Sequence, residues 1–184
     1  MANADEGLWY QWTPLNAGSV AYADVARAVE DFESIDTAAG HEATDWLRSH
    51  SLLNHPSTIT YLYAVEDRID GYFAITSSSV TLSQSQRKAL GPGQSNYRIH
   101  PTQGAALITW LARHREAEDD TASRILTYAI SIALKVAELQ GTLLLVLEAY
   151  DEDLARRWMQ KYGFRRAGAT EAGKSRLWLP LHPL

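Results

Sequence analysis

A run of charged residues stands where many folds hold the phosphates of a nucleotide or coenzyme. The stretch LARHREAEDDTAS, residues 111–123, lies between an apolar, strand-like segment and a long amphipathic, helix-like segment. A helix N-terminus attracts phosphate because its first N–H groups are unpaired and its dipole is positive there. Glycine usually forms such a turn, since it lets the backbone approach the phosphate closely. Residues 111–123 contain no glycine and four acids, so the stretch departs from that chemistry.

The acids of this turn have two opposite effects. Glu118, Asp119 and Asp120 would each stabilise the helix start by a few tenths to about 1 kcal/mol, as caps or first-turn carboxylates. Against a pyrophosphate, each close pair of charges would repel by on the order of several kcal/mol. The basic residues at 113–115 offset part of this repulsion. The residues therefore favour a capped helix over a phosphate-binding turn.

Three other features of the sequence give weaker indications of function. HEATD, residues 41–45, is like the start of a zinc-protease helix, but no second histidine follows on the same face, so we expect no zinc site. No serine has the glycines of a nucleophile elbow, and Ser19 is interpreted as a helix cap. The segment RRWMQKYGFRR, residues 156–166, mixes arginine with aromatic residues, which could suit RNA. A solvated helix face is the simpler interpretation.

The composition is typical of a soluble globular chain. The 184 residues are enough for one domain with a sizeable core, and 46% of them are hydrophobic. The net charge of −5 does not favour nucleic acid or membranes as partners. The absence of cysteine excludes disulfides, thiol nucleophiles and thiolate metal sites. We find neither a signal peptide nor an apolar run long enough to cross a bilayer, so we expect a cytoplasmic protein.

Apolar periodicity predicts the elements that must position these residues. The predicted strands are residues 7–15, 59–67, 69–82, 103–113, 141–150 and 175–181. The predicted helices are residues 19–32, 40–53, 122–137 and 151–164.

The connections between these elements predict the fold class. Asp67 and Arg68 are expected to form a tight hairpin turn, Gly163 to end the last helix, and residues 83–101 to form a loop. The strand at 103–113, expected to be buried on both faces, forms a βαβ unit with the strand at 141–150, so these two strands should be parallel. The predicted class is α+β, with a mixed sheet of six or seven strands and helices on both faces, in a single domain over residues 1–184.

Several segments carry a resemblance to a known family. The order of elements resembles the GNAT acetyltransferases, and the chain is nearest to the toxin-type GNAT proteins of bacterial toxin–antitoxin pairs. The Gly-Phe pair at 163–164, after an aromatic-containing helix, is the most specific match. The other matching segments are residues 31–55, 60–80, 106–126 and 155–168.

The resemblance implies a function. It implies an acyl-CoA-dependent N-acyltransferase that takes acetyl-CoA as cofactor and acts on an amine acceptor such as aminoacyl-tRNA, although the negative net charge does not favour tRNA. A homodimer and an antitoxin or other protein partner are compatible with it.

The resemblance also implies where acetyl-CoA binds, between the fourth and fifth strands. Leu111, Ala112 and Arg113 are then the residues whose backbone pairs with the pantetheine. The residues nearest the phosphates are Thr121, Ala122 and Ser123, with Arg115 as a compensating charge.

Two positions depart from the pattern of the family. AEDDTA, residues 117–122, replaces its Gln-Gly-x-Gly-x-Gly turn. Met159 replaces the tyrosine that protonates the leaving thiolate, and a thioether has no proton to donate. Tyr150 is the candidate substitute acid. Glu148 is the candidate base, although an outward-facing strand acid is the simpler interpretation.

Two functions therefore stay open: an acyltransferase, and a catalytically inactive GNAT-fold pseudoenzyme or module that binds a partner or another ligand. A working coenzyme site predicts unpaired N–H groups at residues 121–123. A closed one predicts that Asp119 or Thr121 caps them and that Trp110 or Trp158 fills the cleft. A toxin-type protein further predicts one exposed basic face formed by Arg156, Arg157, Arg165 and Arg166.

Overall fold

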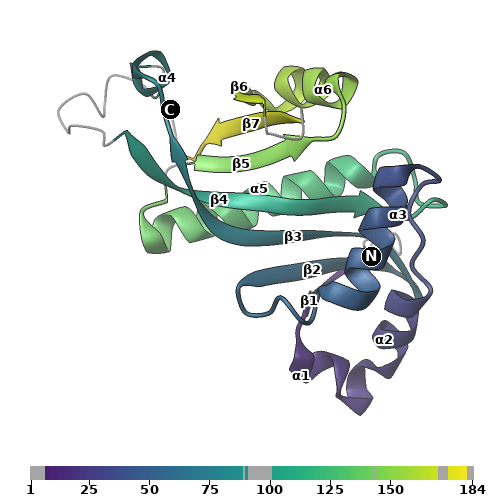
Figure 1. Ribbon diagram of the computed structural model, residues 1–184. Coiled ribbons are helices and arrows are strands. Elements are labelled where there is room, and N and C mark those ends of the chain that lie inside the picture. The colour runs from purple at the N-terminus through teal and green to yellow at the C-terminus, as the bar shows by residue number, and fades with distance from the viewer. Residues whose placement is uncertain (1–6, 89, 91–100, 143, 170–173, 182–184) are drawn as a thin grey trace, which may run out of the picture. The chain divides into compact units, whose positions relative to one another are not determined.

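The computed structural model describes residues 7–88, 90, 101–142, 144–169 and 174–181 (Figure 1). The strands are β1 (Leu8–Trp12), β2 (Thr58–Val65), β3 (Arg68–Thr81), β4 (Thr102–Arg113), β5 (Leu144–Ala149), β6 (Arg165–Ala169) and β7 (Ser175–Pro180). The helices are α1 (Pro14–Ala17), α2 (Ala23–Glu30), α3 (Ala38–Asp45), α4 (Gln84–Lys88), α5 (Thr121–Gln140) and α6 (Glu152–Tyr162). A 3-10 turn spans Val20–Tyr22 and a π-helical turn spans Trp46–His50.

The seven strands form a mixed sheet in the order β1-β2-β3-β4-β5-β7-β6. β4 and β5 are parallel, as the βαβ pattern predicted, whereas β1–β2, β2–β3, β5–β7 and β6–β7 are antiparallel pairs. This confirms the predicted α+β class. The chain divides into two compact units, residues 1–76 with 109–129 and residues 77–108 with 130–184. The single domain expected over the whole chain stays a prediction.

In the first unit, side chains of β2 and β3 alternate between two faces, and helices cover both (Figure 1). Leu62 and Tyr72 share one buried cluster with residues of α2, α3 and the π-helical turn. On the opposite face, the ring of Tyr61 stacks on Phe73, with centroids 5.0 Å apart, and both rings contact Tyr128 of α5. The prediction of helices on both faces is thus confirmed for this unit.

Gly71 of β3 is a point of close approach within the first unit. A Cβ at this position would lie 2.7 Å from the carbonyl oxygen of Ala112 and 2.3 Å from Cδ1 of Ile125. Because only glycine leaves this space open, the end of β4 and the start of α5 can pack directly on β3.

In the second unit, β5 lies between β4 and β7, and its residues 144–147 are buried. Trp178 of β7 and Val146 of β5 belong to the core of this unit. α6 begins at Asp151, whose Oδ1 accepts the N–H of Leu154 at 2.7 Å, and ends at Gly163 with a left-handed φ of 75°. The prediction that Gly163 ends this helix is confirmed.

The first helices and the hairpin differ in detail from the predictions. β1 ends at Trp12 because Thr13 caps α1 and Pro14 occupies its first turn. Ser19 is a cap, as predicted, but of the 3-10 turn that precedes α2. The hairpin turn lies at residues 66–67, one residue earlier than predicted, because Glu66 adopts a φ of 56°.

Two further predictions need correction, and one strand was missed. β4 is not buried on both faces, because Thr109 is exposed. The segment at 83–101 includes the short helix α4, and its residues 89 and 91–100 lie outside the described residues. β6 was not predicted at all, since its sequence RRAGA carries no apolar alternation. Among the described residues, no helix is long and apolar enough to cross a membrane.

Candidate functional site

The end of β4 is the first part of the predicted coenzyme site. The parallel ladder with β5 ends at Ile108 and Leu147, while β4 continues to Arg113. Leu111 and Arg113 are half-buried, and Ala112 is buried in the core of the first unit. These are the three residues that the resemblance assigns to the pantetheine, and their role stays a prediction.

His114, the residue after β4, contacts two segments of the first unit. The N–H of His114 donates to the carbonyl oxygen of Asp70 at 2.8 Å, and His114 forms a β-bridge with Ser34. The hydroxyl of Ser34 donates to the carbonyl oxygen of Arg113 at 3.1 Å. The backbone at this end of β4 is therefore already used for contacts within the protein.

The start of α5 is the predicted phosphate site. The N–H of Thr121 donates to the carbonyl oxygen of Glu118 at 3.0 Å, and the N–H of Ser123 donates to that of Asp120 at 2.9 Å. These N–H groups are thus paired, although with backbone carbonyls and not with the side chain of Asp119. In this arrangement the N–H groups of Thr121 and Ser123 are not free, and a pyrophosphate at this helix start would need them free.

The acids of the turn are paired with two arginines. Asp119 lies 3.6 Å from Arg113, and Arg124 contacts Asp120 at 2.9 Å and Glu118 at 3.5 Å. The hydrogen bond from Arg124 to Asp120 is the main reason that the pKa of Arg124 is raised. Because the pairs are exposed, each contributes little stability, but together they reduce the negative charge at the helix start.

The predicted acid and base lie at the end of β5. Glu148 faces Arg176 across the β5–β7 ladder, and its Oε1 accepts from that guanidinium at 2.7 Å. This is the outward-facing strand acid that the simpler interpretation described. Tyr150 is 49% exposed, with the ammonium group of Lys174 5.5 Å from its ring centroid. Met159 is half-buried on α6. The catalytic roles stay predictions.

The four arginines expected to form a basic face are mostly engaged by neighbours. Arg156 pairs with Asp153, and Arg166 pairs with Glu152, whose pKa it lowers chiefly through their hydrogen bond. Arg165 lies over the ring of Trp178, 5.2 Å from its centroid. Arg157 is exposed on α6.

The tryptophans expected to close a cleft have different surroundings. The ring of Trp110 stacks on Trp46 with centroids 5.6 Å apart, and Trp46 stacks on Tyr72 at 5.9 Å. Trp110 is therefore part of an aromatic stack within the first unit. Trp158 is half-buried on α6, and its role stays a prediction.

Sequence reasoning missed a buried polar cluster beside the end of β4. Asp70 is 4% exposed and accepts from Nε of Arg68 at 2.7 Å. His114 is 6% exposed, and its Nδ1 accepts the N–H of Glu116 at 3.1 Å. Burial lowers the pKa of His114, and the charge of Arg68 adds to this effect. Nothing in the local sequence marked Asp70, because a strand acid next to an arginine usually faces solvent.

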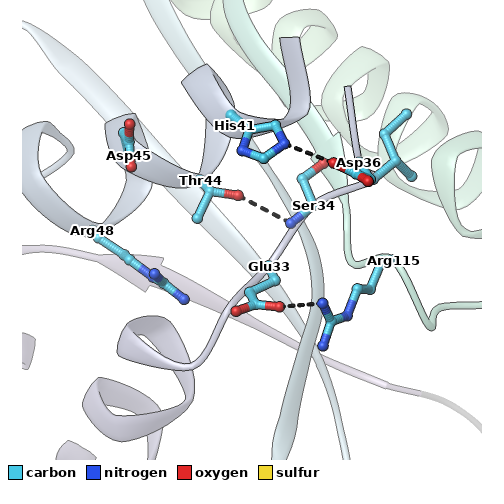
Figure 2. A pocket seen from close by; sticks show the side chains of 9 residues that line it. Glu33, Ser34, Asp36, His41, Thr44, Asp45, Arg48 and Arg115 are labelled. Carbon is cyan, nitrogen blue, oxygen red and sulfur yellow. Dashed lines mark hydrogen bonds and ion pairs between the residues drawn. The ribbon is translucent and has the colours of Figure 1, made fainter. Parts of the chain in front are cut away.

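Two cavities of the first unit, of about 440 and about 370 Å³, share Glu33 and Arg115 in their walls. Figure 2 shows the larger of the two. These two residues form an ion pair at 2.5 Å. The larger cavity is lined by Glu33, Ser34, Ile35, Asp36, His41, Thr44, Asp45, Arg48 and Arg115. The sequence analysis considered residues 41–45 only as a zinc motif and Arg115 only as a charge near the phosphates, so it did not indicate this site. Among the described residues, no group of three or more histidines and acids could hold a metal ion.

Comparison with known proteins connects this architecture to toxins. No protein-family model and no curated protein sequence matches the chain. A structure of AtaT complexed with acetyl-methionyl-tRNAfMet is 17% identical, with a TM-score of 0.64 over 83% of this chain and 86% of that chain. A tyrosine-to-phenylalanine variant of AtaT, bound to the C-terminus of the antitoxin AtaR and acetyl-CoA, is 13% identical, with a TM-score of 0.65 over 96% and 94%.

A tyrosine variant of KacT is 12% identical, with a TM-score of 0.70 over 96% of this chain and 95% of that chain. At these identities the comparisons establish the fold alone. The chain has the fold of the AtaT and KacT toxins, which confirms the predicted GNAT-like architecture.

Proposed function

We propose that this chain is a toxin-type, acyl-CoA-dependent N-acyltransferase-like protein that transfers an acetyl group from acetyl-CoA to an amine acceptor such as aminoacyl-tRNA. The observation that carries the proposal is the shared fold with AtaT, whose structures contain acetyl-CoA and acetyl-methionyl-tRNAfMet. By the same likeness, we propose an antitoxin as a protein partner, as in the AtaT–AtaR complex.

The resemblance assigns roles to residues of this chain. The backbone of residues 111–113 would hold the pantetheine, and Arg115 and residues 121–123 would lie nearest the phosphates. Acyl transfer to an amine depends mainly on positioning, so holding the acetyl group beside the amine would be the main contribution of this backbone frame. Because Met159 has no proton to donate, the hydroxyl of Tyr150 would protonate the leaving thiolate. Glu148 would act as the base toward the amine acceptor.

The proposal requires the turn before α5 to rearrange. Phosphate can bind there only if Thr121 and Ser123 release their N–H groups from the carbonyls of Glu118 and Asp120. Asp119 and Asp120 must also turn away, and their arginine partners, Arg113 and Arg124, are the cations available to take up the phosphate charge.

The same turn favours a second candidate function. A helix start whose N–H groups and acids are already paired suits a protein that keeps the fold and binds a partner or another ligand without acyl transfer. The two candidates differ in whether acetyl-CoA binds at all.

Calorimetric titration with acetyl-CoA tests both candidates. Under the proposed function we expect the wild type to bind in the micromolar range. We expect Asp119→Asn/Asp120→Asn to bind about tenfold more tightly, because two charges that repel the phosphates are gone. Asp119→Gly/Asp120→Gly also frees the backbone, so a further gain over the Asn variant would show that the backbone limits binding.

Asp24→Asn is the matched control, because Asp24 is also a first-turn acid paired with an arginine, Arg27 of α2. Its affinity should equal that of the wild type. Binding by the glycine variant alone would support the second candidate, with the acids of the turn closing the site. No binding by any of the proteins would refute acetyl-CoA as the donor.

A further inference from the structure

The larger cavity of the first unit has walls that are fixed by hydrogen bonds. The hydroxyl of Thr44 accepts the N–H of Ser34 at 3.0 Å and donates to the carbonyl oxygen of Gly40 at 2.9 Å. A Cβ at position 40 would lie 1.9 Å from the carbonyl oxygen of Ile35, so α3 packs directly on the segment after α2. The cavity is therefore a preformed feature of this unit.

Arg48 reaches this cavity from the π-helical turn. The N–H of Ser51 donates to the carbonyl oxygen of Trp46 at 2.9 Å, which closes the wider turn. Trp46 stacks on Tyr72, and Leu47 is fully buried. With these two side chains anchored in the core, Arg48 lies along the cavity wall (Figure 2). Single π-helical turns of this kind are frequent at functional sites.

The guanidinium of Arg48 is incompletely paired. Its Nε is buried and has no hydrogen-bond partner among the described residues. A buried charged donor without an acceptor lowers stability, so native proteins rarely keep one without a reason. Because protein atoms cover Nε, an anionic group in the cavity would reach the terminal nitrogens of this guanidinium, which makes no ion pair among the described residues.

Glu33 presents the opposite charge to the same space, as Figure 2 shows. Its Oε2 pairs with Arg115, whereas its Oε1 makes no hydrogen bond among the described residues. A carboxylate accepts several hydrogen bonds, so Oε1 is open to a cationic donor. Asp36 and Asp45 also lie in the wall, and Asp36 contacts Nε2 of His41 at 2.9 Å.

The charges of the wall select the class of ligand. The three acids of the wall outnumber its two arginines, so a ligand that carries only an anion would meet a net negative charge. A ligand that carries only a cation would leave the guanidinium of Arg48 without an ion-pair partner. A ligand with both charges satisfies both conditions.

We propose that this cavity binds a small zwitterion of the amino-acid class, with its carboxylate on Arg48 and its ammonium group on Glu33. Ile35, which is 41% exposed in the wall, provides an apolar contact for a side chain. The site lies within the first unit and needs no acetyl-CoA, so it does not depend on the proposed acyl transfer.

The test compares three related probes by calorimetry, without acetyl-CoA. L-leucine carries both charges, L-leucinamide lacks the carboxylate, and 4-methylpentanoate lacks the ammonium group. We expect saturable binding of L-leucine and about tenfold weaker binding of each of the other two compounds. Equal binding of all three, or no saturable binding of L-leucine up to about 20 mM, would overturn the proposal.

Variants then assign the two charges. Arg48→Gln should remove the preference for L-leucine over L-leucinamide, and Glu33→Gln should remove the preference over 4-methylpentanoate. Arg27→Gln is the matched control, because Arg27 is an exposed arginine outside the cavity. An Arg48→Gln variant that folds and keeps the wild-type preference would refute the role of Arg48. If this variant does not fold, the probe series on the wild type decides.

Discussion

At the scale of single residues, His114 shows how packing controls charge. Its Nδ1 accepts the N–H of Glu116, which keeps a neutral ring in place. Burial is the largest cause of its lowered pKa, and the charges of Arg68 and Arg115 act in the same direction. Asp70 and Glu116 act in the opposite direction but do not outweigh them. The folded protein therefore favours the neutral imidazole.

This environment predicts a pH dependence of stability. Because the folded pKa of His114 lies below its unfolded value of about 6.5, its contribution is fully present above that pH and is lost as the pH falls through the folded pKa. His114→Asn keeps an acceptor for the N–H of Glu116 but does not titrate. We expect the wild type to lose more free energy of unfolding than this variant between about pH 7.5 and pH 5, measured by urea denaturation. Equal losses would contradict the prediction.

At the scale of elements, β3 holds the end of β4 and the start of α5. The contact at Gly71 sets the distance of β3 from Ala112 and from Ile125. At its own start, α5 is stabilised by the pair of Asp120 and Arg124, four residues apart on one face.

Gly71→Ala tests this packing. A Cβ 2.7 Å from the carbonyl oxygen of Ala112 forces a backbone shift, so we expect a loss of about 1–3 kcal/mol in the free energy of unfolding. Gly104→Ala in β4 is the control, since a Cβ there meets no atom within 4 Å, and it should change stability by less than about 0.5 kcal/mol. Similar denaturation midpoints for the two variants would show that the approach at Gly71 is not limiting.

At the scale of the whole molecule, the charge balance bears on the acceptor. The net charge is −5, and two of the four arginines expected to form a basic face are paired with acids of α6. Phosphate neutralisation supplies most of the affinity for nucleic acid. An RNA acceptor would therefore be held by few cations, and Arg157, exposed and without an ion pair among the described residues, is the first candidate.

Arg157→Glu tests an RNA acceptor directly. If Arg157 contacts a phosphate, the variant should bind aminoacyl-tRNA more weakly, and the slope of log affinity against log salt should fall by about one. Lys135→Glu makes the same change of charge at an exposed position of α5, and its slope should match that of the wild type. Filter binding at several potassium chloride concentrations measures both slopes. Equal slopes for Arg157→Glu and the wild type would argue against a phosphate contact at Arg157.

The sequence by itself determined the α+β class, the parallel pair of β4 and β5, and the end of α6 at Gly163. It also determined that the turn before α5 lacks glycine. These features were readable because periodicity, caps and motif positions are local properties of the chain.

Only the tertiary structure decided which charges meet. Asp119 could have faced a phosphate, but it lies beside Arg113. Glu33 pairs with Arg115, and Arg48 lines the same cavity, although no motif connects these residues. Such contacts join segments that are far apart in the chain, and the packing of α3 and β4 on β3 sets their distances. Those distances cannot be derived from local sequence, so neither the cavity nor the paired N–H groups at the start of α5 could be predicted from it.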